Sequence, residues 1–125
     1  MDRDLGFVFW LGQTLDDAGY QALPAKSIRD ATALLGQLNL EIDLLIVNPS
    51  LDDARGFADA LRRFQGHLKV IAVIGEWEGP SSAFPGADAL EYKPLNQDNV
   101  SRAQWLQTIQ FVFEPPDTTL SATAR

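Results

Sequence analysis

Two apolar stretches decide the fold of this chain: residues 43–47 read DLLIV, and residues 70–74 read VIAVI. After Asp43, which opens the first stretch, each is continuously apolar and too short for a stable helix, which is typical of a strand covered on both faces of a sheet. The segment between them carries apolar residues at helical spacing: Phe57, Ala60, Leu61 and Phe64. Two buried strands joined through a helix predict a parallel sheet in an α/β protein.

Two more helices are predicted before the first of these strands. In the first helix, apolar residues recur every three or four positions, at Leu5, Val8, Leu11 and Leu15. Gly19 ends this helix, because glycine readily adopts the left-handed conformation of the C′ position. Ser27 begins the second helix and caps its first turn together with Asp30. The buried stripe of that helix is predicted to be Ile28, Ala31, Leu34, Leu35 and Leu38. Residues 21–25, between the two helices, are predicted to form a weak strand.

After the second apolar strand the sequence predicts a loop, a strand and a last helix. Residues 75–85 are rich in glycine and proline, so they hold at most a turn or two of helix. Residues 87–92 are predicted to form a short strand, and Asp98 to cap a helix. The apolar residues of that helix are Val100, Leu106, Ile109 and Val112. We expect one domain over residues 1–113 and a flexible tail over residues 114–125, which read EPPDTTLSATAR.

The composition excludes several classes of function. The 125 residues carry 17 acidic and 10 basic side chains, a net charge of −7 and no basic cluster, so no nucleic-acid partner is expected. With no cysteine and His67 as its one histidine, the chain lacks the ligands of a zinc site and the framework of a serine hydrolase triad. The lack of a long apolar run predicts no membrane span and a cytoplasmic protein. We expect no catalytic residue, metal or cofactor.

The order and spacing of several motifs resemble the receiver domains of bacterial response regulators. The resemblance covers residues 2 to about 113. The matching residues are Gly19, Tyr20, Asp43, Gly56, Leu61, Arg62, the VIAVI strand, Gly86, Ala87, Asp88, Lys93 and Pro94. The resemblance implies a flavodoxin-like (CheY-like), doubly wound sheet of five parallel strands in the order 2-1-3-4-5, with its sites at the carboxyl ends of the strands. The fourth helix of that fold is expected to be degenerate here, because its region is short and rich in proline and glycine.

In receivers, a phosphoryl group passes from a histidine kinase to an aspartate that ends the third strand. The resemblance places Asn48 there, and a neutral amide cannot attack phosphorus as a carboxylate does. Asn48 can equally be a loop residue that caps its own turn. The family also places two acidic residues around magnesium. These positions correspond to Asp2 and Arg3, and Arg3 would put a fixed positive charge in place of the metal, while Asp4 offers one further oxygen.

The switch residues of the family are also replaced. Ile74 stands where the family has a threonine or serine that contacts the phosphate, and Leu90 stands where it has the switch aromatic. Tyr92 is expected to lie on the other face of the strand from Leu90, and so not to substitute for it. Lys93 is retained, and in the family this lysine contacts the phosphoryl group while the next peptide bond is often cis. Here Lys93 would neutralise Asp2 or Asp4, or reach solvent.

The first strand of the family has no full counterpart, because Met1 aligns with its last residues. We predict helix for residues 5–11, since a strand there would leave too few residues for a parallel crossover. Strands 2 and 3 would then lie about 10 Å apart, twice the normal spacing. Either residues upstream of Met1 fill this position, or the segment IQFVF at 109–113 does, from this chain or from a second copy. We favour the second copy, which predicts a domain-swapped or edge-paired homodimer.

The sequence therefore predicts a non-phosphorylatable receiver-like domain that acts as a protein interaction module in a two-component-type pathway. Its partner would be a kinase, a regulator or a second copy. Trp77 and Phe84 would either form an exposed contact patch or fold back over the sheet as a lid. The alternative function is a flavodoxin-like sensor that binds a small ligand between Asn48, Ile74 and Lys93.

Overall fold

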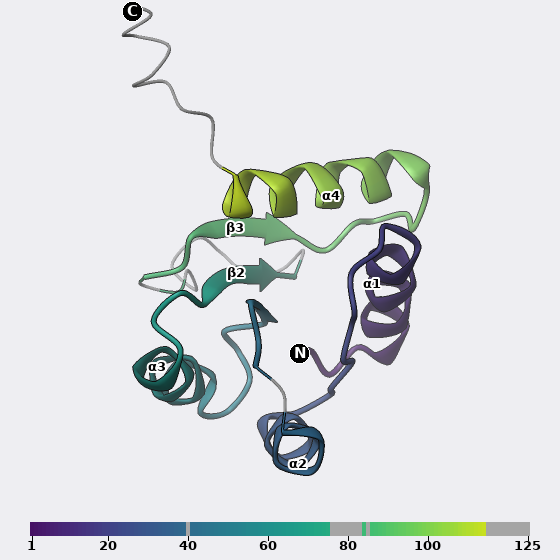
Figure 1. Ribbon diagram of the computed structural model, residues 1–125. Helices are drawn as coiled ribbons and strands as arrows, with labels where there is room; N and C mark the ends of the chain where they lie inside the picture. The colour runs from purple at the N-terminus through teal and green to yellow at the C-terminus, as the bar shows by residue number, and fades with distance from the viewer. Residues whose placement is uncertain (40, 76–83, 85, 115–125) are drawn as a thin grey trace, which may run out of the picture.

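The computed structural model describes residues 1–39, 41–75, 84 and 86–114. Along the chain its elements are α1 (Leu5–Asp17), α2 (Ile28–Leu38), β1 (Leu44–Val47), α3 (Ala54–Phe64), β2 (Lys69–Ile74), β3 (Ala89–Tyr92) and α4 (Asn99–Phe113). The strands form one parallel sheet in the order β1-β2-β3. Helices α1 and α4 cover one face of this sheet, and α3 covers the other (Figure 1). The described part of the chain is thus a doubly wound α/β fold.

The position of β2 in the middle of the sheet explains why its sequence shows no alternation of apolar and polar residues. Ile71 and Val73 pack in one apolar cluster with Trp105 of α4 and Phe7 of α1. Val70 and Ala72 point the other way and pack in a second cluster with the buried alanines of α3. All of these β2 side chains are fully buried, so both faces of the strand select apolar residues.

The predicted helix boundaries are confirmed by their caps. Gly19 has a φ of +93° and follows α1, in the left-handed conformation that ends a helix. The hydroxyl of Ser27 accepts a hydrogen bond from the N–H of Asp30 at 3.1 Å. The carboxylate of Asp98 accepts one from the N–H of Ser101 at 2.9 Å. These contacts satisfy backbone donors in the first turns of α2 and α4.

Some sequence expectations are wrong in detail. Residues 21–25 form no strand in the structure; Ala25 accepts a backbone hydrogen bond from the N–H of Asp2 at 3.2 Å. The predicted stripe of α2 is not fully buried: Ala31 is, but Leu38 is 47% exposed. In α4 the buried residues are Trp105, Ile109 and Val112, whereas Val100 in the first turn is 76% exposed.

The segment at 109–113 is part of helix α4, with Ile109 and Val112 buried in the core. It therefore does not fill a strand position in this chain. Phe84 is buried in the cluster on the α3 side of the sheet, so it folds back over the sheet as one of the two alternatives predicted. Trp77 and the tail beyond residue 114 lie outside the described residues. Within the described part, no helix is long and apolar enough to cross a membrane.

Candidate functional site

The N-terminus of the chain lies against the carboxyl end of β1. The amino group of Met1 donates a hydrogen bond to the carbonyl of Ile46, and the carbonyl of Met1 accepts one from the N–H of Asn48 at 3.0 Å. On its other side, the N–H of Asp2 donates to the carbonyl of Ala25 at 3.2 Å. These backbone hydrogen bonds place Asp2 at the carboxyl end of the sheet, where the residues that follow β1 and β3 meet.

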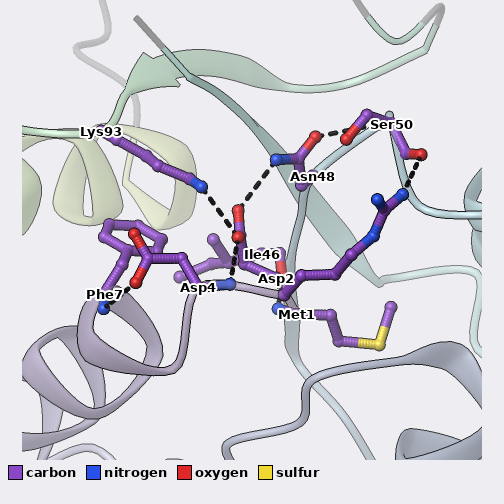
Figure 2. Close-up of polar contacts among 9 residues, drawn as sticks. Met1, Asp2, Asp4, Phe7, Ile46, Asn48, Ser50 and Lys93 are labelled. Atoms are coloured by element: carbon purple, nitrogen blue, oxygen red, sulfur yellow. Dashed lines mark hydrogen bonds and ion pairs between the residues drawn. The ribbon is translucent and has the colours of Figure 1, made fainter.

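Asp2 is the centre of the polar cluster at this end of the sheet (Figure 2). One carboxylate oxygen, Oδ1, accepts hydrogen bonds from Nζ of Lys93 and from the N–H of Asp4, each at 2.8 Å. The other, Oδ2, accepts a bond from Nδ2 of Asn48 at 2.9 Å. Asp2 is 2% exposed and Asn48 is 4% exposed. The structure thus brings together Asp2, Asn48 and Lys93, and both oxygens of the carboxylate are occupied.

The electrostatic balance of this cluster favours an ionised Asp2. Burial alone would raise the pKa of Asp2, because it removes the carboxylate from water. The hydrogen bonds from Lys93, from the Asp4 N–H and from Asn48 outweigh burial and hold the pKa of Asp2 below its ordinary value. The buried carboxylate and the ammonium of Lys93 therefore neutralise each other at neutral pH.

Lys93 is held in place by more than its ion pair. Its backbone N–H donates to the carbonyl of Ile74 at 2.9 Å, which ties the end of β3 to the end of β2. Its ammonium also lies 5.6 Å from the ring centre of Phe7 in α1, within the range of a cation–π contact. No peptide bond in the described residues is cis, so the bond that follows Lys93 is trans.

Arg3 and Asp4 contribute less directly than the acidic-pocket prediction implies. The guanidinium of Arg3 donates to the carbonyl of Ser50 at 2.9 Å on the exposed surface. Asp4 is the N-cap of α1, and its carboxylate accepts the N–H of Phe7 at 3.2 Å. This capping role is missing from the sequence prediction, although an aspartate directly before an apolar helix is a common N-cap signal.

Asn48 serves both the loop and the polar cluster. Its Oδ1 accepts a hydrogen bond from the N–H of Ser50 at 2.9 Å, which is the turn-capping contact expected of an asparagine. Its Nδ2 points the other way, to Asp2. The amide therefore uses its acceptor on the backbone and its donor on the carboxylate.

The predicted switch positions lie at the ends of β2 and on β3. Ile74 is fully buried and can donate no side-chain hydrogen bond. Leu90 and Tyr92 are 39% and 49% exposed and lie on the same face of β3, because residues two apart in a strand share a face. The prediction that Tyr92 faces away from Leu90 is therefore wrong.

Glu91, which lies between Leu90 and Tyr92, is buried on the opposite face of β3. Its contacts were not predicted from the sequence. Its carboxylate accepts hydrogen bonds from the hydroxyl of Thr108 at 2.6 Å and from Nε2 of Gln104 at 3.1 Å. Glu91 therefore ties β3 to helix α4.

The residues of the polar cluster around Asp2 do not fit a magnesium ion. Magnesium takes carboxylate oxygens in an octahedral shell. Here both oxygens of Asp2 already accept hydrogen bonds, and Asp4 caps a helix. The phosphoacceptor position that the resemblance assigns holds the amide of Asn48 instead of a carboxylate. Among the described residues, no group of three or more histidine, aspartate or glutamate side chains could hold a metal ion.

Comparisons with known proteins identify the fold. No protein-family model and no curated protein matches the chain. Among solved structures, the chain is similar to a CheY-like response regulator receiver domain protein from Methanospirillum hungatei JF-1, with 24% identity, a TM-score of 0.68, and 87% of this chain and 86% of that chain covered. It is also similar to the chemotaxis response regulator CheY4 of Vibrio cholerae, with 20% identity, a TM-score of 0.63, and coverage of 86% and 92%.

A third structure is a response regulator protein from Burkholderia pseudomallei, described with a phosphorylated aspartic acid, a calcium ion and citrate. Its identity is 19% and its TM-score 0.61, with 91% of this chain and 72% of that chain covered. The chain therefore has the flavodoxin-like fold of CheY-like receiver domains. Its described strands β1, β2 and β3 correspond to strands 3, 4 and 5 of the predicted order.

Proposed function

We propose that this chain is a receiver-like signalling domain that works without phosphoryl transfer, as a protein interaction module in a two-component-type pathway of the cytoplasm. The observation that carries the proposal is the closed cluster at the end of β1. The amide of Asn48 stands at the phosphoacceptor position that the resemblance assigns, and it donates to a carboxylate already paired with Lys93.

The chemistry of this cluster argues against an acyl phosphate. A carboxylate oxygen can attack phosphorus and expel the donor's leaving group, but the nitrogen lone pair of an amide is delocalised. Nδ2 of Asn48 acts as a hydrogen-bond donor to Asp2, which is the opposite of a nucleophile's role. The positive charge of Lys93, which would stabilise a bound phosphoryl group, is already neutralised by Asp2.

An exposed apolar edge supports a role in protein interaction. Strand β3 lies at one edge of the sheet, and the chain passes from it into α4. Apolar side chains stand out along this path: Leu90 is 39% exposed, Tyr92 49%, Leu95 77% and Val100 76%. We name these four residues the β3–α4 patch. Exposed apolar residues at the edge of a sheet are a feature of surfaces that bind another protein.

A small-ligand sensor is less well supported by the cavities of this molecule. A cavity of about 730 Å³ is present, but its lining includes none of the three residues expected to surround a ligand, Asn48, Ile74 and Lys93. Those three positions are joined by the contacts of the polar cluster instead. A protein partner, which would be a kinase, a regulator or a second copy, therefore suits the site better.

The lack of phosphoryl transfer is tested by incubating the chain with acetyl phosphate and magnesium and measuring its intact mass. We expect no phosphoryl adduct on the unaltered chain. We also expect none on Asn48→Asp, because Ile74 and Arg3 remain and groups that act as a unit are strongly non-additive. A phosphorylatable receiver domain treated in parallel is the positive control. A phosphoryl adduct on the unaltered chain, removable by hydroxylamine, would contradict the proposal, and efficient labelling of Asn48→Asp would show that the pocket is misassigned.

The interaction role is tested with the double variant Leu95→Glu/Val100→Glu as bait in native cell extract. We expect the double variant to retain at least about tenfold less of the partner proteins that the unaltered chain retains. One buried charge in an apolar contact costs more than about 1.4 kcal/mol of binding free energy. Phe64→Glu is the matched control, because Phe64 is 87% exposed on α3, outside the patch. Equal retention by all three baits would contradict a role for the β3–α4 patch.

A further inference from the structure

The polar cluster around Asp2 brings three side chains of different chemistry into contact: a lysine amine, a carboxylate and an asparagine amide. Oδ1 of Asp2 accepts a hydrogen bond from Nζ of Lys93 at 2.8 Å, and Oδ2 accepts one from Nδ2 of Asn48 at 2.9 Å. Figure 2 shows the amine and the amide reaching the same carboxylate from two sides. Asp2 therefore contacts both of the nitrogens that exchange places when a lysine amine displaces ammonia from an asparagine amide.

Lys93 has the chemistry of the nucleophile in such a reaction. A lysine amine attacks a carbonyl carbon once it has lost its proton, and the carboxylate of Asp2 is in place to take that proton. The backbone N–H of Lys93 is bonded to the carbonyl of Ile74, so the base of the side chain is fixed. Attack needs Nζ within about 3–3.5 Å of Cγ of Asn48, and rotation of the flexible lysine stem closes the remaining gap.

Asn48 is held as the electrophile. Its Oδ1 accepts the N–H of Ser50 at 2.9 Å, so a backbone donor already faces the oxygen on which negative charge develops during attack. Asn48 is 4% exposed, which keeps water, the competing nucleophile, away from Cγ. An asparagine ordinarily loses ammonia when the backbone nitrogen of the next residue attacks its side chain. The next residue here is Pro49, whose nitrogen carries no hydrogen, so that route is closed.

Asp2 is placed to carry protons between the two nitrogens. It is 2% exposed, and the N–H of Asp4 also donates to its Oδ1 at 2.8 Å, which fixes the carboxylate between Lys93 and Asn48. Transfer of a proton from the ammonium to the carboxylate leaves two neutral groups, and burial disfavours charged groups more than neutral ones. A positioned carboxylate that accepts a proton from one nitrogen and delivers it to another is a general acid–base catalyst.

We propose that Lys93 and Asn48 join in an amide bond between Nζ and Cγ, formed within the folded chain by displacement of ammonia. Asp2 first takes a proton from Nζ, and the neutral amine attacks Cγ of Asn48. The C=O electron pair moves to Oδ1, where the N–H of Ser50 stabilises it. When this pair returns, the Cγ–Nδ2 bond breaks and Asp2 delivers its proton to Nδ2. The second proton from Nζ passes through the same carboxylate to the departing ammonia, so the products are an amide bond and an ammonium ion, with Asp2 again ionised.

The bond would connect the two outer strands of the described sheet. Asn48 follows β1 and Lys93 follows β3, on either side of β2. Closing the loop between these residues covalently limits the conformations of the unfolded chain, as a disulfide does. The lack of phosphoryl transfer does not depend on this bond, because the side chain of Asn48 is an amide both before and after the reaction.

The test is the intact mass of the full chain, measured in denaturant after purification and again after prolonged incubation under native conditions. We expect a species that is lighter by the mass of one ammonia molecule and whose fraction grows during the incubation. Digestion with trypsin, which cuts after lysine and arginine, should release residues 30–55 joined to residues 70–102.

Two variants provide the controls. Lys93→Arg keeps a positive charge beside Asp2, but a guanidinium stays protonated and does not attack, so no loss of ammonia is expected. Asp2→Asn keeps the shape of the side chain but cannot carry a proton, so we expect the bond to form at least about a hundredfold more slowly. Circular dichroism checks that each variant is folded.

An unchanged mass in the folded, unaltered chain after the incubation would overturn the proposal. A loss of ammonia that persists in Lys93→Arg would overturn it equally, since the loss would then arise at another asparagine. Bond formation at the unaltered rate in Asp2→Asn would overturn the role of Asp2 as the proton carrier.

Discussion

Replacing Lys93 with methionine is expected to lower the free energy of unfolding by about 3–5 kcal/mol at neutral pH, because it leaves a buried carboxylate without its partner. Asp2 is 2% exposed, and its Oδ1 lies 2.8 Å from Nζ of Lys93. Methionine keeps an unbranched apolar side chain beside Phe7, so the loss reports the charge and not the packing. Chemical denaturation of both proteins measures the difference.

Two further variants separate the charge from other effects. The double variant Asp2→Asn/Lys93→Met removes both charges and should recover more than half of the loss. Arg102→Met removes an exposed pair of similar length, with Asp17 at 2.9 Å, and should change stability by less than about 1 kcal/mol. A loss below 1 kcal/mol for Lys93→Met would mean that water screens the cluster and that the site is not closed.

The chain that begins at Met1 is expected to become more stable as the pH rises from about 6 to about 8. The pKa of the Met1 amino group is about 6 in the folded protein, lowered from 8.0 mainly by burial. Between these values the unfolded chain binds a proton that the folded chain has released, so stability rises with pH. The gain is at most about 3 kcal/mol across this window. Below pH 6 both states are protonated, and above pH 8 neither is, so this contribution is then constant.

Acetylation of the amino group provides the control for this pH dependence. The acetylated chain keeps an N–H that can donate to Ile46 but has no charge to titrate, so its profile should be flat in this window. Both samples should carry His67→Gln, so that the one histidine does not contribute. Equal slopes in the two samples would place the amino group of Met1 in solvent and contradict the buried geometry.

Local signals in the sequence were sufficient to predict a parallel α/β sheet, whereas the flavodoxin-like strand order was implied by the resemblance alone. After Asp43, the runs LLIV and VIAVI have no polar residue to expose, and their short length favours strands inside a doubly covered sheet. Ser27, Asp98 and Gly19 act through contacts within three residues, and these contacts depend little on the rest of the molecule. By contrast, the burial of Leu38 and Val100 depends on what packs against each helix, which periodicity alone does not contain.

The sequence predicted which residues form the site but left the contacts between them open. The resemblance singled out Asp2, Asn48 and Lys93, and it left open whether Lys93 pairs with Asp2, pairs with Asp4 or reaches solvent. The structure pairs it with Asp2, which is 91 positions away. A contact of that separation depends on the register of the sheet, and no local pattern specifies it. The shared face of Leu90 and Tyr92 was predictable from the period of a strand alone, and the contrary prediction was an error of reasoning.

The central claim is that the end of the sheet forms one closed state that phosphoryl chemistry does not change. The most direct test is a set of amide NMR spectra of the ¹⁵N-labelled chain, recorded alone, with magnesium, and with magnesium and acetyl phosphate. The account predicts that the amide signals of Asp2, Asn48 and Lys93, and those of Leu90 and Tyr92 on β3, keep their positions in all three spectra. Saturable shifts at the cluster, accompanied by shifts along β3, would contradict it.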